Sequence, residues 1–286
     1  MTQSFAEVIG DPVAQSKSPI IHKHWLDALA IEGRYDRTRV TSDKLAAFLD
    51  GRRANGAWRG CNVTIPHKER IIPLLDRVDA GAAAIGAVNC VVSEDGGLAG
   101  YNTDVDGVAA ALASTKADGA KAAVIGAGGA ARAAISWLAG AGVARISLLV
   151  RNPEKAQPLR ELAPHAEFAI LPFDRADEAF ADASIIVNAS PLGMVGSAEM
   201  PSAIIDALIA HANGITVFDM VTTPAETAFL EAARTGQAGR TVDGLTMLIG
   251  QARRAFELFF GRPPPEDESA LRHLLLSQSL EGLLAQ

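Results

Sequence analysis

Short apolar runs, polar loops and helical stretches follow one another along the first third of the chain. Phe5–Ile9, Tyr35–Val40 and Gly60–Ile65 have the length and composition of buried strands. Pro19–Ala30 and Lys44–Leu49 have helical periodicity. Strands that alternate with helices predict a mostly parallel sheet with helices on its faces.

A second alternating series follows Asp104 and predicts another sheet. Helices are expected near Gly107–Ala113 and at Ala130–Ala139, on either side of an apolar strand at Ala122–Ile125. This order is typical of a doubly wound nucleotide-binding domain, so we expect an α/β protein. Later apolar runs have the same strand character: Arg145–Val150, Phe168–Leu171, Ile185–Asn188 and Thr216–Asp219.

The C-terminal region is predicted to be helical. An apolar stripe with helical spacing indicates a helix that packs on a core, and a further apolar segment at 271–283 follows three consecutive prolines. The stripe consists of Leu245, Leu248, Ile249, Ala252, Phe256 and Phe259.

Composition agrees with a folded chain of two domains. The 286 residues suffice for two domains, and 49% apolar with 21% charged residues are values near the averages for globular proteins. The net charge of -7 disfavours nucleic acid and anionic membrane surfaces as partners. Any phosphate group that the chain binds therefore has to be held by local positive charge or backbone N–H groups.

The cysteines, the N-terminal segment and the apolar runs indicate in which cellular compartment the protein works. Cys61 and Cys90 have no further thiol or histidine at ligand spacing, so neither a disulfide framework nor a metal site is predicted. Met1–Gly10 contains Glu7 and lacks the basic segment of a signal peptide. The longest apolar stretch is interrupted by Arg132, short of the ~18 to 20 residues that a membrane span requires. These features favour a cytoplasmic protein.

One glycine-rich turn has the spacing of a dinucleotide site. The segment Gly126-Ala127-Gly128-Gly129-Ala130-Ala131 fits G-x-G-x-x-G/A and lies between a predicted strand and a predicted helix. Gly126 permits the tight turn, Gly128 lets backbone N–H groups approach a pyrophosphate, and Ala131 allows close helix packing. The alternative is a glycine-rich turn that binds no ligand.

The residues after the next strand favour NADP over NAD. NAD enzymes usually place a carboxylate ~20 residues after the glycine turn, to bind the ribose hydroxyls. This chain instead has Arg151 and Asn152 there, with Lys155 four residues after the arginine. Two cations are suited to a 2′-phosphate. The alternative is that Arg151 opens a solvated loop.

Several polar clusters are more specific than ordinary loops. In the first third they are Gln15-Ser16-Lys17-Ser18-Pro19, the segment from Gly60 to Glu69, Gly86-Ala87-Val88-Asn89 and Asn102-Thr103-Asp104. Together they resemble the shikimate dehydrogenase family. The resemblance spans nearly the whole chain and continues, in family order, through Gly126–Arg132, Asn188–Met194 and Asp243-Gly244-Leu245 with Gln251.

The resemblance implies two domains and one reaction. Residues 1–104 and 243–286 would form an α/β substrate-binding domain, and residues 105–242 a Rossmann-type NADP-binding domain. The reaction would be the reversible, NADPH-dependent reduction of 3-dehydroshikimate to shikimate, in aromatic amino acid biosynthesis. The resemblance leaves the chain either a monomer or a homodimer.

The resemblance also implies roles for individual residues. Ser16 and Ser18 would hold the substrate carboxylate, whereas Thr64, Asn89 and Gln251 would hold the ring hydroxyls. These short hydroxyl and amide side chains supply donors and acceptors without bulk, as a small polyhydroxylated acid requires. The cofactor residues would be Gly126, Ala127, Gly128, Gly129, Ala130, Arg151, Asn152, Lys155, Met220 and Gly244.

Lys68 and Asp104 are the candidates for catalysis. Hydride transfer to a ketone leaves negative charge on oxygen, so a proton donor is needed there. Lys68 would supply that proton, and Asp104 would pair with Lys68 and bind a neighbouring hydroxyl. Without the resemblance, Lys68 is a solvated lysine after Pro66 and Asp104 a helix N-cap. His67 is expected to be structural.

Two departures from the family pattern stand out. Thr222 occupies a position where family members usually carry a tyrosine that helps to hold the substrate. The family's Asn-Thr-Asp-Gly-x-Gly motif is altered here to Asn102-Thr103-Asp104-Val105-Asp106-Gly107. Thr222 is still expected to contact the substrate, but with a shorter reach. Two alternatives therefore stay open: a dehydrogenase for quinate or a related cyclic hydroxy acid, and a non-catalytic sensor of NADP or a metabolite.

Overall fold

Two compact units make up the chain in the computed structural model, which describes residues 3–284, and side chains as far as residue 277. The first unit holds the residues up to Asp104 together with Gln251–Leu275. The second holds Val105–Gly250 and the residues from Leu276 onward. Residues 243–250 thus group with the second unit, where a Cβ built on Gly244 would lie 2.5 Å from the Met220 carbonyl oxygen.

The first unit is built on a six-stranded mixed sheet in the order β2-β1-β3-β5-β6-β4. Pairs β1/β2, β1/β3 and β4/β6 are parallel, whereas β5 runs antiparallel to β3 and β6, so this sheet is less parallel than the alternation predicts. Its elements are β1 (Ser4–Gly10), α1 (Ser18–Ala28), β2 (Gly33–Arg39), α2 (Leu45–Arg53), β3 (Trp58–Val63), β4 (Arg77–Val78), α3 (Ala80–Ile85), β5 (Cys90–Glu94) and β6 (Gly97–Tyr101).

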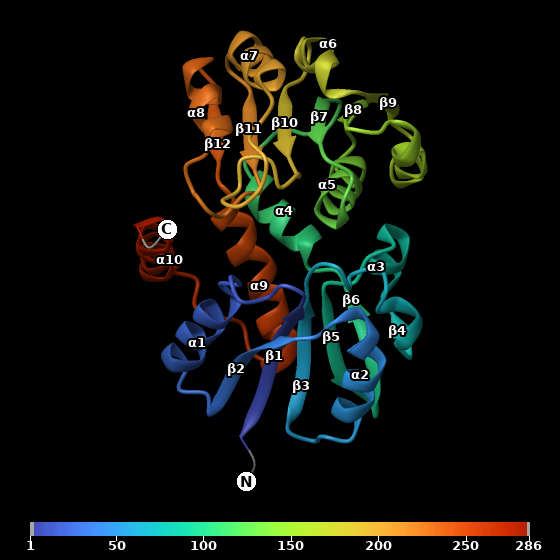
Figure 1. Cartoon of the computed structure of the whole chain (residues 1–286), viewed down its shortest axis with the longest axis vertical. Helices are drawn as coiled ribbons and strands as arrows, with labels where there is room; N and C mark the ends of the chain where they lie inside the picture. The colour runs from blue at the N-terminus through green and yellow to red at the C-terminus, as the bar shows by residue number, and fades with distance from the viewer. Residues whose placement is uncertain (1–2, 285–286) are drawn as a thin grey trace. The chain divides into compact units, whose positions relative to one another are not determined.

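The second unit is built on a six-stranded parallel sheet in the order β12-β11-β10-β7-β8-β9. This is the strand order of a doubly wound nucleotide-binding fold, as predicted. In Figure 1, β7 in green lies beside β10 in yellow. The strands are β7 (Lys121–Ile125), β8 (Arg145–Leu149), β9 (Glu167–Leu171), β10 (Ile185–Asn188), β11 (Thr216–Asp219) and β12 (Arg240–Val242).

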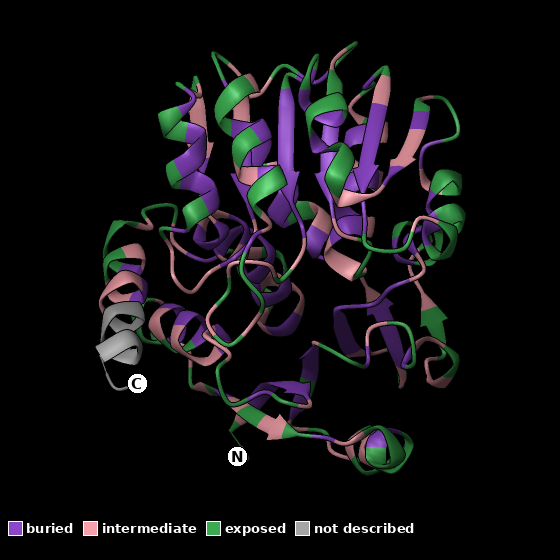
Figure 2. Cartoon of the chain, turned by 45° about the horizontal axis from the view of Figure 1, so that its top comes forward, coloured by how far each residue is buried: buried purple, intermediate pink, exposed green. Residues whose placement is uncertain are grey.

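Helices cover both faces of the second sheet. Along β7, Ala122 and Val124 belong to one buried cluster, and Ala123 and Ile125 belong to another. Alternate residues of a strand point to opposite faces, so two cores exist, one on each side of the sheet, and Figure 2 shows these strands largely buried. The helices are α4 (Asp104–Leu112), α5 (Gly129–Gly140), α6 (Ala176–Phe180), α7 (Ser202–His211) and α8 (Ala228–Thr235).

Two long helices complete the chain: α9 (Gly244–Phe260) and α10 (Ser269–Leu284). The predicted stripe on α9 is buried except for Leu248, which is half-buried. Ala255 and Phe259 pack with Ala6 and Val8 of β1. Within residues 3–284, none of the helices has both the length and the apolar character that a membrane crossing requires.

Candidate active site

Two polar loops of the first unit hold each other through side-chain amides. Asn102 Nδ2 donates to the Ala87 carbonyl oxygen at 2.8 Å, and the Thr103 N–H donates to Asn89 Oδ1 at 2.7 Å. Asn89 Nδ2 donates to Asp104 Oδ1 at 2.9 Å. Because Asn89 is buried, water competes little with these bonds. The sequence clusters Gly86–Asn89 and Asn102–Asp104 are therefore joined into one hydrogen-bonded group.

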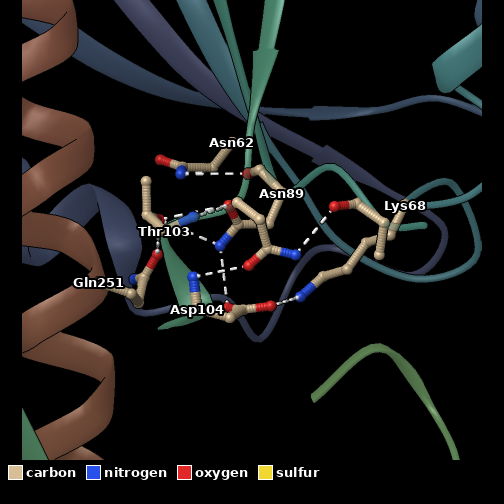
Figure 3. A network of polar contacts seen from close by, with 8 residues as sticks. Asn62, Lys68, Asn89, Thr103, Asp104 and Gln251 are labelled. Carbon is tan, nitrogen blue, oxygen red and sulfur yellow. Dashed lines mark hydrogen bonds and ion pairs between the residues drawn. The ribbon is translucent and has the colours of Figure 1, made fainter. Parts of the chain in front are cut away.

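Lys68 and Asp104 form an ion pair in this unit (Figure 3). The Lys68 ammonium donates to Asp104 Oδ2, and only 19% of the lysine side chain and 9% of the aspartate side chain is exposed. The Lys68 backbone is fixed as well, because its carbonyl accepts from the Val88 N–H at 2.8 Å. Lys68 is thus a held cation rather than a solvated surface lysine. Asp104 is the first residue of α4, and its two carboxylate oxygens accept from Asn89 and Lys68.

Gln251 joins the same group of side chains from α9. Its Oε1 lies 3.4 Å from Thr103 Oγ1, and the side chain is 9% exposed. Thr103 Oγ1 in turn accepts from Asn89 Nδ2 at 3.1 Å. Figure 3 shows that Gln251, Thr103, Asn89, Asp104 and Lys68 converge on one region. The structure thus brings together four residues that the sequence proposed for substrate or catalysis.

Ser16 and Ser18 lie at the beginning of α1 and contact each other. Ser16 Oγ donates to Ser18 Oγ at 3.2 Å and accepts from the Ser18 N–H at 3.3 Å. Ser18 is buried and Ser16 half-buried. Between them, partial burial lowers the pKa of Lys17. Thr64, directly after β3, is half-buried, and its N–H donates to the Ile9 carbonyl oxygen at 2.9 Å.

His67 is structural in its contacts. It is fully buried, and its Nε2 lies 2.6 Å from the Val40 carbonyl oxygen. A carbonyl can only accept, so this nitrogen carries the proton. The ring therefore fastens the segment before Lys68 to the end of β2.

The glycine turn of the second unit has the geometry that its spacing predicts. Gly126 has φ +108°, and a Cβ there would lie 2.9 Å from the Ala189 carbonyl oxygen, so a side chain would strain this position. Gly128 is the N-cap of α5 and has open space around it. Helix α5 has 12 residues and no acid in its first turn, and it includes Gly129 and Ala130. Its N-terminus can therefore receive an anion.

A cavity of about 590 Å³ opens beside this turn. It is lined by Gly126, Ala127 and Gly128 together with the predicted Arg151, Asn152 and Lys155, all three of which are exposed. No carboxylate lines it, so its charge and its glycine backbone fit a phosphorylated dinucleotide. Further lining residues, for which the sequence predicted no role, are Val150, Ala156, Phe173, Ala189, Ser190, Pro191, Leu192, Ser197 and Ala198.

Met220, Thr222 and Gly244 lie outside the lining of that cavity. They belong to a second feature of this unit, the segment that follows β11. Gly244 packs on this segment, since a Cβ there would lie 2.4 Å from the Val221 carbonyl oxygen and 2.5 Å from that of Met220. Met220 and Thr222 are both half-buried.

Asp219 organises this segment, and sequence reasoning gave it no role. Its Oδ1 accepts from Asn188 Nδ2 at 2.9 Å and from the Val221 N–H at 3.0 Å, and its Oδ2 accepts from Thr227 Oγ1 at 2.6 Å. Burial raises the pKa of Asp219 to about 6, although these three donors oppose the shift. Asn188 Oδ1 also accepts from Ser190 Oγ at 2.6 Å, which connects Asp219 to a loop of the cavity.

Metal ligands do not gather in the described part of the chain: no group of three or more histidine, cysteine or acidic side chains there could hold an ion. Cys61 and Cys90 are both buried, and neither forms a disulfide.

Comparison with known proteins identifies the family. Residues 8–91 match a shikimate dehydrogenase substrate binding domain, residues 108–193 a shikimate / quinate 5-dehydrogenase domain, and residues 244–268 a shikimate 5'-dehydrogenase C-terminal domain. A shikimate dehydrogenase (NADP(+)) of Sphingopyxis alaskensis is 48% identical over 96% of this chain and 97% of its own length. The chain belongs to the shikimate/quinate dehydrogenase family.

Solved members of the family have the same fold. A shikimate dehydrogenase in complex with NADP+ is 32% identical, with a TM-score of 0.86 over 96% of both chains. A quinate dehydrogenase of Corynebacterium glutamicum in complex with NAD is 30% identical, with a TM-score of 0.83 over 96% of this chain and 99% of that one. Family members of this fold thus differ in substrate and in cofactor.

Proposed function

We propose that this chain catalyses the reversible, NADP-dependent oxidation of shikimate to 3-dehydroshikimate, a reaction of aromatic amino acid biosynthesis. The observation that carries the proposal is the ion pair between the half-buried Lys68 and the buried Asp104, surrounded by amide and hydroxyl side chains. The name of the relative that is 48% identical supports both the substrate and the cofactor.

Lys68 moves the proton in this proposal. In the reducing direction its ammonium donates a proton to the carbonyl oxygen as that oxygen gains charge, and in the oxidising direction its amine accepts the proton of the hydroxyl. Asp104 holds the Lys68 ammonium in one position and accepts a hydrogen bond from a neighbouring ring hydroxyl. The pairing within one unit supports these roles, because a fixed donor loses less entropy when the substrate arrives.

The other polar side chains orient the ring. Ser16 and Ser18 bind the substrate carboxylate, and Thr64, Asn89 and Gln251 bind ring hydroxyls. Burial of Ser18, Asn89 and Gln251 supports this assignment, because each bond is then made in a medium of low dielectric.

NADP occupies the 590 Å³ cavity and the N-terminus of α5 in this proposal. Its nicotinamide accepts a hydride from the substrate carbon when oxidised and returns it when reduced. The backbone of Gly126–Ala130 faces the pyrophosphate, Arg151, Asn152 and Lys155 bind the 2′-phosphate end, and Met220 and Gly244 serve the nicotinamide end. Residues 1–104 and 243–286 would then be the substrate-binding domain and residues 105–242 the NADP-binding domain.

A second candidate substrate is quinate, and Thr222 favours it. Thr222 replaces the tyrosine that family members usually carry, so one long-reaching hydroxyl is missing from the substrate site. The name of one structural relative, a quinate dehydrogenase of the same fold, supports this alternative. Relative turnover of shikimate and quinate separates the two, and Thr222→Tyr is expected to shift the ratio towards shikimate.

The remaining expectations are a cytoplasmic enzyme, active as a monomer or a homodimer, with no nucleic acid partner. Cys61 and Cys90 are both buried and are not joined by a disulfide, which is in keeping with a reducing compartment.

The test of the proposed function is NADPH formation by the purified chain with shikimate, alongside quinate as alternative substrate and NAD as alternative cofactor. We expect the highest kcat/KM for shikimate with NADP+. If shikimate and NADP+ stabilise the chain against heat but no turnover occurs with any pair, the chain is a sensor and not an enzyme.

A further inference from the structure

One side of strand β2 contacts Ser16, in the loop before α1, and Ser18, the first residue of α1. Because alternate residues of a strand share a side, Tyr35, Arg37 and Arg39 point the same way. Arg37 donates through Nε at 2.9 Å and Nη2 at 2.6 Å to the Ser16 carbonyl oxygen. Arg39 Nε donates to Asp11 Oδ1 at 2.7 Å, and Asp11 lies at the other end of the loop that carries Ser16. This side of β2 therefore fixes the serine loop at two points.

Tyr35 is the buried member of that row. Its hydroxyl donates to Asn62 Oδ1 at 2.6 Å, and Ser18 is a side-chain hydrogen-bond partner of the same hydroxyl. The Tyr35 ring stacks on His22, with ring centroids 3.9 Å apart and an interplanar angle of 6°. The hydroxyl of Tyr35 thus lies between a proposed carboxylate-binding serine and β3.

The surroundings of Tyr35 keep its proton in place. Burial raises the pKa of Tyr35 well above its ordinary value and lowers the pKa of His22 to about 3. Both ring nitrogens of His22 are buried and lack a hydrogen-bond partner within the described residues. Tyr35 is therefore a protonated phenol beside a neutral ring, and it can donate to Asn62 throughout the working pH range.

The chain of contacts continues to the catalytic pair. Asn62 Nδ2 donates to the Asn89 carbonyl oxygen at 3.3 Å, and Asn89 Nδ2 donates to Asp104 Oδ1 at 2.9 Å. Asp104 Oδ2 accepts from Lys68. Figure 3 shows the part of this chain from Asn62 to Lys68. Tyr35 thus connects the serines at one end of the site with the proton-transfer residues at the other.

We propose that Tyr35 and Arg37 are positioning residues, which hold Ser18 and Ser16 at the distance from Lys68 and Asp104 that the substrate requires. Neither residue is assigned a contact with the substrate. The inference rests on the proposed function in one respect, namely that the serines bind the substrate carboxylate. The inference predicts that loss of the hydrogen bonds made by Tyr35 or by Arg37 weakens binding of the substrate carboxylate, while proton transfer at Lys68 continues.

The test uses Tyr35→Phe, which keeps the stacked ring, and Arg37→Gln on the exposed edge of the sheet. Loss of one buried or charge-assisted hydrogen bond is expected to raise the KM for shikimate about tenfold, with kcat changed less than about threefold. The KM for NADP+ is expected to stay at the wild-type value. Arg34→Gln is the matched control, because it removes the same charge from the opposite side of β2, where Arg34 pairs with Asp36 at 2.8 Å.

Two further measurements distinguish a positioning role from a long-range charge effect and from a general loss of affinity. If Arg37 acted only as a distant positive charge, added salt would abolish the difference in KM between Arg37→Gln and the wild type, and that result would overturn the inference for Arg37. If Tyr35 and Arg37 act through the serines that bind the shikimate carboxylate, the methyl ester of shikimate is expected to bind Tyr35→Phe and the wild type equally well. Equal weakening for acid and ester would overturn the inference.

Direct calorimetric binding of shikimate keeps this test distinct from that of the proposed function. Absence of wild-type turnover would refute the function alone, since the binding comparison can still be made. Unchanged shikimate affinity in both Tyr35→Phe and Arg37→Gln would refute the positioning role, whether or not the wild type turns shikimate over.

Discussion

Asp219→Asn is expected to change how the stability of the chain depends on pH. The folded-state pKa of Asp219 is raised from 3.8 to about 6, because the carboxyl group is fully buried. Below about pH 3 the group is protonated in both the folded and the unfolded state, so it adds no cost. Between pH 3.8 and pH 6 the unfolded chain is ionised while the folded chain keeps the proton, so the unfolding free energy falls as the pH rises; above pH 6 the folded chain ionises too and the loss is complete. The shift of about two units corresponds to roughly 3 kcal/mol of unfolding free energy.

Asparagine cannot ionise, so the variant avoids this cost. The unfolding free energy of Asp219→Asn minus that of the wild type is therefore expected to increase by roughly 3 kcal/mol between pH 3 and pH 7, and to stay constant above pH 7. Urea unfolding at several pH values measures this difference. Asp182→Asn is the control: Lys121 lowers the pKa of Asp182, so its difference is expected to change in the opposite direction. A difference for Asp219→Asn that is the same at pH 4 and pH 7 would refute the reasoning.

Three further substitutions test the cofactor cavity of the second unit and the polar cluster of the first. Gly126→Ala places a Cβ 2.9 Å from the Ala189 carbonyl oxygen at φ +108°, so we expect the KM for NADP+ to rise on the order of tenfold while calorimetric shikimate affinity is unchanged. Arg151→Gln is expected to raise the KM for NADP+ about tenfold and to leave the KM for NAD nearly unchanged, as steady-state rates with both cofactors will show. Asp104→Asn removes the charge that holds Lys68, so kcat is expected to fall on the order of a hundredfold; a kcat within threefold of the wild type would contradict the assigned role.

Local patterns were sufficient for the nucleotide-binding fold. The strands Ile185–Asn188 and Thr216–Asp219 form at the predicted residues, because four consecutive buried positions in the first and three in the second leave little choice. The hairpin of β5 and β6 was not predicted, although Asp95-Gly96 lies between its strands, with φ +50° and +79°. An Asp-Gly pair between apolar runs is a hairpin signal, and it would have revealed that the first sheet is mixed.

The site could be predicted only in part from the sequence. Lys68 and Asp104 lie 36 residues apart in the sequence, so their pairing could be predicted only from the resemblance to the family. Asn62 lies in the cluster from Gly60 to Glu69, but nothing in the sequence indicates its hydrogen bond with Tyr35, since 27 residues and a change of strand separate the two. Asp219 reads as the end of an apolar strand, and its role depends on Asn188 and Thr227, which only the fold places beside it.

The most direct measurement of the central claim is shikimate oxidation by Lys68→Met, which nearly keeps the length of the side chain but cannot carry a proton. We expect kcat to fall by about a thousandfold while calorimetric shikimate affinity stays within about threefold of the wild type. A variant that retains the wild-type kcat would show that another group moves the proton.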